Sequence, residues 1–493
     1  MADLKDIISL IPEVDKKDKA LIEKAYNFAK EAHKDQKRNS GEPYFTHVAI
    51  TGKNLAEIGM DTKTIVAGIL HDILEDTETT EEELRKKFGK EILTLVTGVT
   101  KLGTLKYSGD KRRVESLRKF FMAITNDIRI LIIKLADRLH NIETLKYVPK
   151  EKQERIALET IEIYARLADR IGMGKLKGQL EDAAFPFAYP KEYEKTNKMI
   201  KEKSSDFEKE LDRVSKILKK ELKKEKINVV EISQRVKYKY SLWCKLKRYN
   251  MDIDKIYDIV ALRVIVDNTE SCYRVLGLCH TLWKPLPGRI KDYIANKKPN
   301  GYRSLHTTVF TGNGGTVEIQ IRTPEMHAEA AHGIAAHFIY KDISNNGRGR
   351  RKADPNKKKL KWLNQLKEMQ DVVSNPTKFI DDLKMDLFRD RIFVFTPNGD
   401  VVDLPENSST IDFAYAIHSD IGNHAQSAKV NGKMVSLNTK LQNNDIIEIK
   451  TNKKAQPSSK WLSYTKTTTA HKYIKAHMKE NDLLTKFRSF VKF

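Results

Sequence analysis

The chain has 493 residues, 40% of them hydrophobic, and its 90 Lys and Arg residues exceed 67 Asp and Glu residues to give a net charge of +23. At about 100–200 residues per domain, this length predicts roughly three domains with real cores. The charge favours a polyanionic partner, nucleotide phosphates or nucleic acid, although solvated Lys-rich helices produce the same excess. Three cysteines without C-x-x-C spacing argue against a zinc ribbon or a disulfide framework. With no run of 18 apolar residues and no apolar signal core, we expect a cytoplasmic protein without a membrane span.

Residues 1–195 are expected to form helix after helix, with short polar turns between them. Within this region the apolar run TKTIVAGILHDILEDT, residues 62–77, predicts a buried helix that carries a histidine and three acids in its final turns. On such a helix His71 lies beside Glu75, and Asp72 lies beside Asp76, because residues four apart share a face. Burying ionisable groups is costly unless each is paired or bound to a metal, so this stretch indicates a site.

A second apolar helix, DIRILIIKLADRLHNIETL, places Asp137, Asn141 and Thr144 on one stripe. Upstream, a turn rich in Gly and Pro precedes a further histidine. Two imidazoles and two carboxylates suit a divalent first-row ion such as Mn²⁺, Fe²⁺ or Zn²⁺, which lowers the pKa of bound water. This set comprises His47, His71, Asp72 and Asp137, and the two acids placed to orient the water or move protons are Glu75 and Asp76. The alternative is that each histidine is a hydrogen-bonded core residue.

The pattern changes after a charge-dense helical stretch at 190–226. From residue 227, INVVEI, IVALRVIV, HTTVF and TVEIQIR are short β-rich runs interleaved with helical segments, which predicts an α/β or α+β domain. Residues 341–361 are rich in Gly, Asn, Lys and Arg and are expected to form a loop or linker. From residue 388, RIFVFTPNGDVVDLP predicts a hairpin, KVNGKMVSLNTKLQNNDIIEIKT predicts a second hairpin-like unit, and the tail at 451–493 is helical and basic.

Strict alternation in TVEIQIRT places Glu318, Gln320 and Arg322 on one face of a strand, and NGYRSLHTTV does the same for polar residues that include Tyr302 and His306. A half-exposed sheet would give the same alternation. Asp258 suits Mg²⁺ as a carboxylate at the start of a strand, and no P-loop motif occurs. Basic residues that complement phosphate are Arg235, Lys237, Lys239, Lys245, Lys247, Arg248, Arg289 and Lys291.

Four segments, SGEPYFTH, HDILEDT, GVTKL and KLADRLHNIETL, resemble the hydrolase domain of the long RelA/SpoT homologues, the bifunctional (p)ppGpp synthetase/hydrolases. The resemblance implies an all-α HD-type domain over residues 1–195 that removes the 3′-pyrophosphate of (p)ppGpp. It implies that Mn²⁺ is held by His47, His71, Asp72 and Asp137, and that the attacking water is assisted by Glu75 and Asp76. The positions that match guanosine recognition are Arg38, Asn141 and Thr144. The family often has Lys after this arginine, where the chain has Asn39.

Four further segments, YDIVALRVIV, LPGRIKDYIANKKPNGYRSLHTTV, VEIQIRT and AAHGIAAHFIYK, resemble the synthetase domain of the same family. The resemblance implies an α/β nucleotidyltransferase-like domain over residues 196–345, which transfers the β,γ-pyrophosphate of ATP to the 3′-hydroxyl of GDP or GTP. Asp258 would bind Mg²⁺, Glu318 would complete the metal site or deprotonate the hydroxyl, and Tyr302 would stack on guanine. Adenine would lie between Arg235 and Arg263. The phosphates would meet Lys237, Lys245, Lys291 and His306.

Two details of these segments bear on activity. The form Arg289-Ile290-Lys291-Asp292 matches the R-x-K-D motif of bifunctional members rather than the acidic motif of synthetase-only members. The family's M-H-x-x-A-E-x-G motif is altered, with Ala331 at the position we align with its glutamate, which predicts reduced synthesis if that acid contributes.

Residues 388–450 resemble a TGS domain, a small β-grasp module that in the long members meets the 3′ end of deacylated tRNA on the ribosome, with His418 at the contact position. The alternative is a β-grasp module for protein interaction. A basic connector is expected at 346–387 and the start of a helical region at 451–493; the zinc-finger-like and ACT modules of long members do not appear. The expected function is a bifunctional alarmone enzyme with coupled sites. The alternatives are a hydrolase-dominant form with weak synthesis, and a tRNA- or ribosome-binding stress sensor.

Overall fold

The computed structural model describes residues 3–11, 14–103, 124, 126–298, 300–312, 315–336 and 391–490. Contacts divide the chain into two units, residues 1–295 with 300–376, and residues 296–299 with 377–493. The basic segment at 341–361 and the expected connector at 346–387 lie outside the described residues. In the part of the chain that is described, no helix has both the length and the apolar character needed to span a bilayer.

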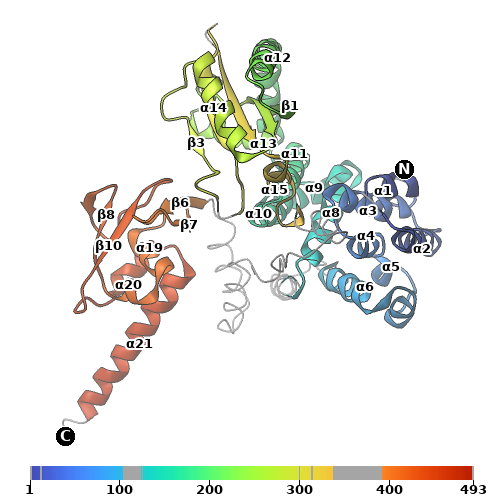
Figure 1. Ribbon diagram of the computed structural model, residues 1–493. Helices are drawn as coiled ribbons and strands as arrows, with labels where there is room; N and C mark the ends of the chain where they lie inside the picture. Colours follow the sequence, from blue (N-terminus) through green and yellow to red (C-terminus); the bar gives the residue numbers. More distant parts are fainter. Residues whose placement is uncertain are drawn as a thin grey trace, which may run out of the picture. The chain divides into compact units, whose positions relative to one another are not determined.

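The first unit begins with helices joined by short turns, as the sequence predicts (Figure 1). Side-chain caps begin several of them; the Asp15 carboxylate accepts the backbone N–H of Asp18, and that of Asp61 accepts Thr64 N–H. The helices are α1 (Leu4–Ser9), α2 (Lys16–Ala32), α3 (Phe45–Ile58), α4 (Thr62–Ile69), α5 (Ile73–Asp76), α6 (Glu81–Gly103), α8 (Arg129–Glu143), η1 (Leu145–Tyr147), α9 (Lys150–Glu159), η2 (Thr160–Tyr164), α10 (Ala165–Arg170), α11 (Gly174–Ala188) and α12 (Pro190–Lys224).

The expectation of one continuous helix over residues 62–77 is wrong. Helix α4 ends at Ile69 and α5 begins at Ile73, so His71 and Asp72 lie in the turn between them. His71 Nδ1 donates to the carbonyl oxygen of Gly68 at 2.8 Å, and Asp72 stands at the N-terminus of α5, where the helix dipole favours a carboxylate. The turn therefore aims two polar side chains out of an otherwise apolar segment.

An α/β part completes the described portion of the first unit. Its five-stranded sheet has the order β1-β2-β5-β4-β3, in which β2 and β5 are parallel and the other neighbours are antiparallel. The elements are β1 (Val229–Val236), α13 (Lys239–Arg248), η3 (Ile253–Lys255), β2 (Val260–Val266), α14 (Thr269–Leu282), β3 (Lys291–Asp292), β4 (Leu305–Phe310), β5 (Thr316–Arg322), α15 (Pro324–His332) and η4 (Gly333–Ala335).

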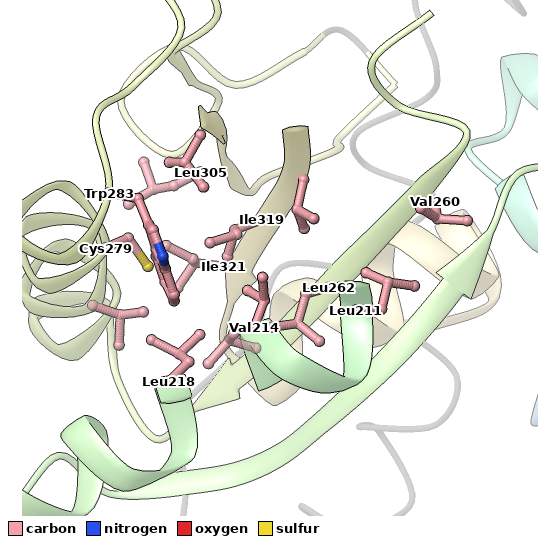
Figure 2. Packing of buried hydrophobic residues seen from close by; sticks show 14 of the residues in the cluster. Leu211, Val214, Leu218, Val260, Leu262, Cys279, Trp283, Leu305, Ile319 and Ile321 are labelled. Atoms are coloured by element: carbon pink, nitrogen blue, oxygen red, sulfur yellow. The ribbon is translucent and has the colours of Figure 1, made fainter. Parts of the chain in front are cut away.

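One face of this sheet is apolar and packs against α12 and α14 (Figure 2). Leu211, Val214 and Leu218 of α12 meet Leu262 of β2 and Ile319 of β5 in a single buried cluster. Because side chains alternate along a strand, the neighbours of these residues must face the opposite side of the sheet. Gln320 and Arg322 on the opposite face are each only 3% exposed, whereas Arg263 and His306 there are partly exposed, so the polar residues of β5 do not form the solvent face of a plain half-exposed sheet.

The helical part and the α/β part of the first unit meet at backbone level. Ile334 N–H donates to the carbonyl oxygen of Ile171 at 3.0 Å. Gly333 has a φ of +55°, and a Cβ there would lie 2.2 Å from that same oxygen. Only glycine accepts both this backbone conformation and this approach without strain, so the junction depends on the absence of a side chain.

The second unit contains the two predicted hairpins. Strands β6 (Arg391–Phe395) and β7 (Val401–Pro405) pair antiparallel, and β8 (Ala425–Val430) turns into β9 (Lys433–Val435) through Asn431-Gly432, both with positive φ. Strand β10 (Ile447–Thr451) pairs with β8, so β8 is the central strand of a three-stranded sheet in which β9 and β10 are the edges. The helices are α19 (Thr410–Ile417), α20 (Ser419–Asn423), η6 (Ser459–Ser463) and α21 (Thr468–Phe490).

Candidate metal and nucleotide sites

Three helical segments of the first unit bring a histidine–carboxylate cluster together. His47 comes from α3, His71 from the turn after α4, and Asp137 from α8; all three are buried, and one potential ligand atom of each lies within 4.8 Å of the others. His47 Nε2 is 3.1 Å from Asp137 Oδ1, and His71 Nε2 is 3.1 Å from Asp72 Oδ2. Asp72 is partly exposed at the edge of the cluster. The four predicted ligands are therefore neighbours in space.

The donor set fits a divalent cation. His71 Nε2 is buried and makes no hydrogen bond, although the Asp72 carboxylate is near, because the two groups are not aligned for one. Burial opposes the charged form of His71, but the carboxylates of Asp72 and Asp137 raise its pKa to about 10. Burial likewise opposes ionisation of Asp72, but the two histidines hold its pKa well below the usual range. Two imidazoles and two ionised carboxylates are the ligands that Mn²⁺, Fe²⁺ and Zn²⁺ accept.

Tyr44 connects the cluster to the acids that follow it. Its hydroxyl lies 2.7 Å from Asp72 Oδ2 and 2.8 Å from Asp76 Oδ2, and burial together with these two carboxylates raises the pKa of Tyr44. Glu75 is exposed along one side, but partial removal of water from its carboxyl group, with the charge of Asp72, raises its pKa to about 7. Glu75 is thus able to exchange a proton near neutral pH.

The predicted guanosine-recognition residues lie beside the same cluster. Arg38 Nη2 donates to Asn141 Oδ1 at 2.5 Å, and Arg38 Nη1 lies 3.1 Å from His140 Nδ1. Asn141 Nδ2 in turn donates to Asp137 Oδ1 at 2.5 Å. Thr144 is the C-terminal residue of this group and its hydroxyl bonds to the His140 carbonyl. Asn141 therefore contacts Asp137 of the cluster directly, and Arg38 contacts Asn141 and His140 beside it. Thr144 stands at the C-terminal end of α8.

A second cluster is built by the register of the sheet. Arg263, Gln320, His306 and Lys291 are cross-strand partners along one row, and Ala261, Glu318 and Thr308 form the next row on the same face. This face is opposite the apolar cluster of Figure 2. His306 Nδ1 and Glu318 Oε1 are 2.6 Å apart, and Tyr302 lies with its hydroxyl 2.7 Å from His306 Nε2. Burial opposes ionisation of Glu318, but His306 lowers its pKa.

Asp258 precedes β2, and its carboxylate contacts the ammonium groups of two lysines. Lys237 Nζ lies 2.7 Å from Asp258 Oδ2, and Lys245 bonds to the same oxygen. Although burial disfavours the charged carboxylate, these two lysines lower the pKa of Asp258 to about 2. The other oxygen, Oδ1, is buried and has no hydrogen-bond partner, which leaves an ionised oxygen available to a cation.

Cationic groups crowd the end of the sheet beyond Gln320. The pKa of Arg263 and that of Arg322 are lowered by burial and by neighbouring arginines, the latter to about 10. Arg235 Nη1 approaches Gln320 Oε1 at 3.4 Å. A buried cluster of like charges is unfavourable until an anion offsets it, so this face is suited to phosphate.

Three predicted contact residues remain to be placed, namely Arg289, Lys291 on β3 and His418 in the second unit. The guanidinium of Arg289 lies 5.5 Å from the centre of the Tyr257 ring, and Lys291 is exposed on β3. In the second unit His418 is exposed, and its Nδ1 accepts the backbone N–H of Asp420 at the start of α20.

The sequence reasoning missed three neighbours of the first cluster, namely Tyr44, Lys134 and His140. Lys134 Nζ is 2.6 Å from Asp137 Oδ2, and His140 Nδ1 is 2.8 Å from His47 Nδ1. All three belong to the segments quoted for the family resemblance, and they are the polar residues there that follow or precede predicted ligands by three residues. That spacing was the available signal, because residues three apart on a helix share a face.

Comparison with known proteins gives matches in the same order along the chain. The HD domain matches residues 25–174, the region found in RelA/SpoT proteins matches 234–345, and the TGS domain matches 392–451. A guanosine-3′,5′-bis(diphosphate) 3′-pyrophosphohydrolase from Aquifex aeolicus is 45% identical over 94% of this chain and 65% of its own length. A GTP pyrophosphokinase from Myxococcus xanthus is 44% identical over 93% of this chain and 60% of its own.

A second 3′-pyrophosphohydrolase, from Borreliella burgdorferi, is 41% identical over 94% of this chain and 68% of its own length. Among solved structures, small alarmone synthetase 2 from Bacillus subtilis is 25% identical over 35% of this chain and 93% of that chain, with a TM-score of 0.23. The chain spans about two thirds or less of the first two relatives. The chain matches these three domains in this order and is more than 40% identical to these relatives along nearly its whole length. The chain therefore belongs to the RelA/SpoT family.

Proposed function

We propose that this chain is a bifunctional alarmone enzyme, which hydrolyses (p)ppGpp at the helical site and synthesises it at the sheet site, in the cytoplasm. The observation that carries the proposal is that one chain holds both clusters complete: His47, His71 and Asp137 in one place, and Asp258 and Glu318 in another. Relatives named for each reaction align with over 90% of the chain.

At the helical site, His47, His71, Asp72 and Asp137 would hold Mn²⁺. The ion would acidify a water molecule and neutralise phosphate charge. Glu75, with a pKa near 7, is suited to take the proton from the water that attacks the 3′-pyrophosphate, and Tyr44 holds Asp76 beside it. The bond between the 3′-oxygen and the phosphorus would break, the 3′-oxygen would take up the proton that Glu75 removed from the water, and GDP or GTP would leave with pyrophosphate as the second product.

At the sheet site, Asp258 would hold Mg²⁺ through its unpartnered oxygen, and this ion would neutralise phosphate charge. Lys237 and Lys245 stand where the phosphates of ATP need cations. Glu318, held by His306, would accept the proton of the 3′-hydroxyl of GDP or GTP. The new bond would join that oxygen to the β-phosphorus of ATP. The bond between the β-phosphorus and the oxygen that bridges it to the α-phosphorus would break, so that AMP leaves. Arg235 and Arg263 would flank adenine, and Tyr302 would stack on guanine.

Paired assays test the two activities on one preparation. The protein is incubated with Mn²⁺ and ppGpp, and separately with Mg²⁺, ATP and GDP, and the nucleotides are separated by chromatography. Asp72→Ala should abolish only hydrolysis, and Glu318→Gln should abolish only synthesis. Loss of both activities in either variant, or neither activity in the unmodified chain, would contradict the proposal of two separate catalytic sites.

We further propose that the TGS module binds the 3′ end of deacylated tRNA, because the match covers residues 392–451 and His418 is exposed. Since His418 also accepts the N–H of Asp420, His418→Asn keeps a local acceptor and separates capping from binding. We expect weaker binding of deacylated tRNA by His418→Ala and by His418→Asn. Equal binding by both variants and by the unmodified chain would exclude this role.

A further inference from the structure

His140 is a buried residue of the first unit to which the proposed reaction assigns nothing. It is 5% exposed and follows Asp137 on α8 by three positions. Its ring lies edge to edge with that of His47, with ring centres 5.1 Å apart and planes inclined by 19°, and the two Nδ1 atoms are 2.8 Å apart. One hydrogen atom must lie between these two nitrogens, because two bare lone pairs at that distance would repel.

The neighbouring guanidinium decides which nitrogen carries the hydrogen. Arg38 Nη1 lies 3.1 Å from His140 Nδ1, and a guanidinium has only donors. His140 Nδ1 must therefore accept, so it carries no hydrogen, and the hydrogen between the two rings belongs to His47 Nδ1. In the neutral His47 ring, the lone pair is then on Nε2, which is 3.1 Å from Asp137 Oδ1, and a cation bound by both atoms would remove the repulsion between them.

His71 shows the same arrangement with a different acceptor. Its Nδ1 donates to the backbone carbonyl of Gly68 at 2.8 Å, which leaves its Nε2 facing the carboxylates. Metal-binding histidines commonly have the second ring nitrogen fixed in this way by a carbonyl or carboxylate. For His47 the described residues offer a histidine in that place, and that histidine is itself fixed by an arginine.

We propose that His140 is a positioning residue that fixes His47 in the Nε2 metal-binding tautomer, with Arg38 keeping His140 in the accepting form. This inference rests on the proposed metal site. Arg38 also bonds to Asn141, which bonds to Asp137, so Arg38, His140, His47, Asp137 and Asn141 form a closed ring of contacts. A nucleotide that engages Arg38 would act on two metal ligands through this ring, which couples substrate binding to cation binding.

Two substitutions of the same residue separate positioning from simple structural support. His140→Asn keeps an acceptor near the place of Nδ1, whereas His140→Leu has similar bulk and no acceptor. Both are made in an Asp258→Asn background, so that the second carboxylate site does not take up the probe. Metal-stripped full chain is titrated with Mn²⁺ alone, and free Mn²⁺ is followed by electron paramagnetic resonance. His280→Leu, which removes a histidine of the α/β part hydrogen-bonded to Thr307, is the control.

We expect His140→Leu to weaken Mn²⁺ binding about 10- to 100-fold, and His140→Asn and His280→Leu to keep most of the affinity. If His140→Leu binds Mn²⁺ as tightly as the parent protein, the positioning role of His140 is overturned and the proposed metal site is not. Equal weakening by Asn and Leu, with equally lowered thermal unfolding midpoints, means structural support only and also overturns it. No Mn²⁺ binding by the parent, or binding that survives His71→Ala, overturns the proposed metal site and this inference with it.

Discussion

Single hydroxyl and imidazole groups decide how the first cluster is arranged. Tyr44 is the clearest case, since one oxygen contacts both Asp72 and Asp76 and its burial keeps it protonated. The hydroxyl has one hydrogen and can donate to only one carboxylate at a time. Its oxygen nevertheless lies within hydrogen-bond distance of both Asp72, a proposed metal ligand, and Asp76, a proposed proton carrier. No hydropathy pattern predicts this contact, because it joins α3 to the turn after α4.

We expect Tyr44→Phe to slow hydrolysis of ppGpp about 10- to 100-fold, since a hydrogen bond to a charged group contributes about 1.5–3 kcal/mol. Synthesis should be unchanged, because the sheet site does not involve this residue. Initial rates of both reactions check the prediction. Tyr147→Phe, at a 46% exposed tyrosine of the same helical part, serves as the control. Equal hydrolysis by Tyr44→Phe and the parent would show that the hydroxyl is dispensable.

His327 on α15 gives a residue-scale prediction for pH. Partial burial, with the charges of Arg322 and Arg263, lowers its pKa to about 4. The unfolded chain, with an ordinary histidine pKa near 6.5, therefore binds the proton first as the pH falls. The stability contribution is complete above about pH 6.5 and is lost as the pH falls toward 4. His327→Gln should reduce the loss of unfolding free energy between pH 7 and pH 5 in urea titrations, and His424→Gln, in the second unit, should not.

At the scale of elements, close packing of α3 against α4 places His47 and His71 on facing segments. Gly68 allows this approach, because a Cβ there would lie 2.2 Å from Leu55 Cδ1. The same residue supplies the carbonyl that fixes the His71 ring. The packing of two helices and the orientation of a metal ligand thus depend on one position.

Gly68→Ala is expected to lower the unfolding free energy of the first unit by about 1–3 kcal/mol, the usual cost of an added methyl group in a filled core. It should also weaken Mn²⁺ binding if the buried Leu55 side chain cannot change rotamer, because α4 would then have to move away from α3. Gly277→Ala is a matched control on α14, where a Cβ would meet nothing within 4 Å, and it should be neutral or stabilising by up to about 1 kcal/mol. Thermal unfolding and Mn²⁺ titration of both variants test this prediction. Equal unfolding free energies and equal Mn²⁺ affinities of Gly68→Ala and Gly277→Ala would contradict the packing argument.

For the whole molecule, the two proposed reactions oppose each other, so simultaneous activity would waste ATP. The helical and α/β parts meet at the Ile171–Ile334 backbone contact and around a cavity of about 20 Å³ lined by Asn54, Glu57, Ile58, Leu139, Met173, Lys175, Leu176, Gln179, Ala331 and His332. We expect a ligand at one site to disfavour the competent form of the other. Equal rates of both reactions, with no effect of guanine nucleotides on their ratio, would contradict this.

Ala331 belongs to this cavity, where most of its companions come from α3, α8 and α11 of the helical part. The longer side chain of Ala331→Glu must displace residues that line this cavity, so it should lower the thermal unfolding midpoint of the first unit. We expect no gain in the rate of synthesis by Ala331→Glu. Ala331→Ser adds only a hydroxyl group and should leave the unfolding midpoint and the rate of synthesis unchanged. A clear rise in synthesis by Ala331→Glu would instead favour the hydrolase-dominant alternative, in which the missing acid weakens the synthetase.

The order of elements and the predicted ligands could be derived from the sequence because they depend on local patterns. Helical spacing placed Asp137 and Asn141 on one stripe, and strand alternation separated Glu318 and Gln320 from the apolar core; these are properties of segments. The break in the helix at His71 was missed, since apolar periodicity continues through a turn in which the His71 side chain also bonds to the carbonyl oxygen of Gly68.

What only the tertiary structure decided is which groups share protons and charge. The sequence by itself determined the domain order, the residue types of the two proposed sites and the basic character of the sheet site, because each is encoded within a continuous motif. The pairing of Asp258 with two lysines, the Nδ1 contact between His140 and His47 and the contacts of the Tyr44 hydroxyl join residues up to 93 positions apart. Such contacts depend on helix packing and strand register, which long-range burial of apolar surface selects and no local pattern specifies.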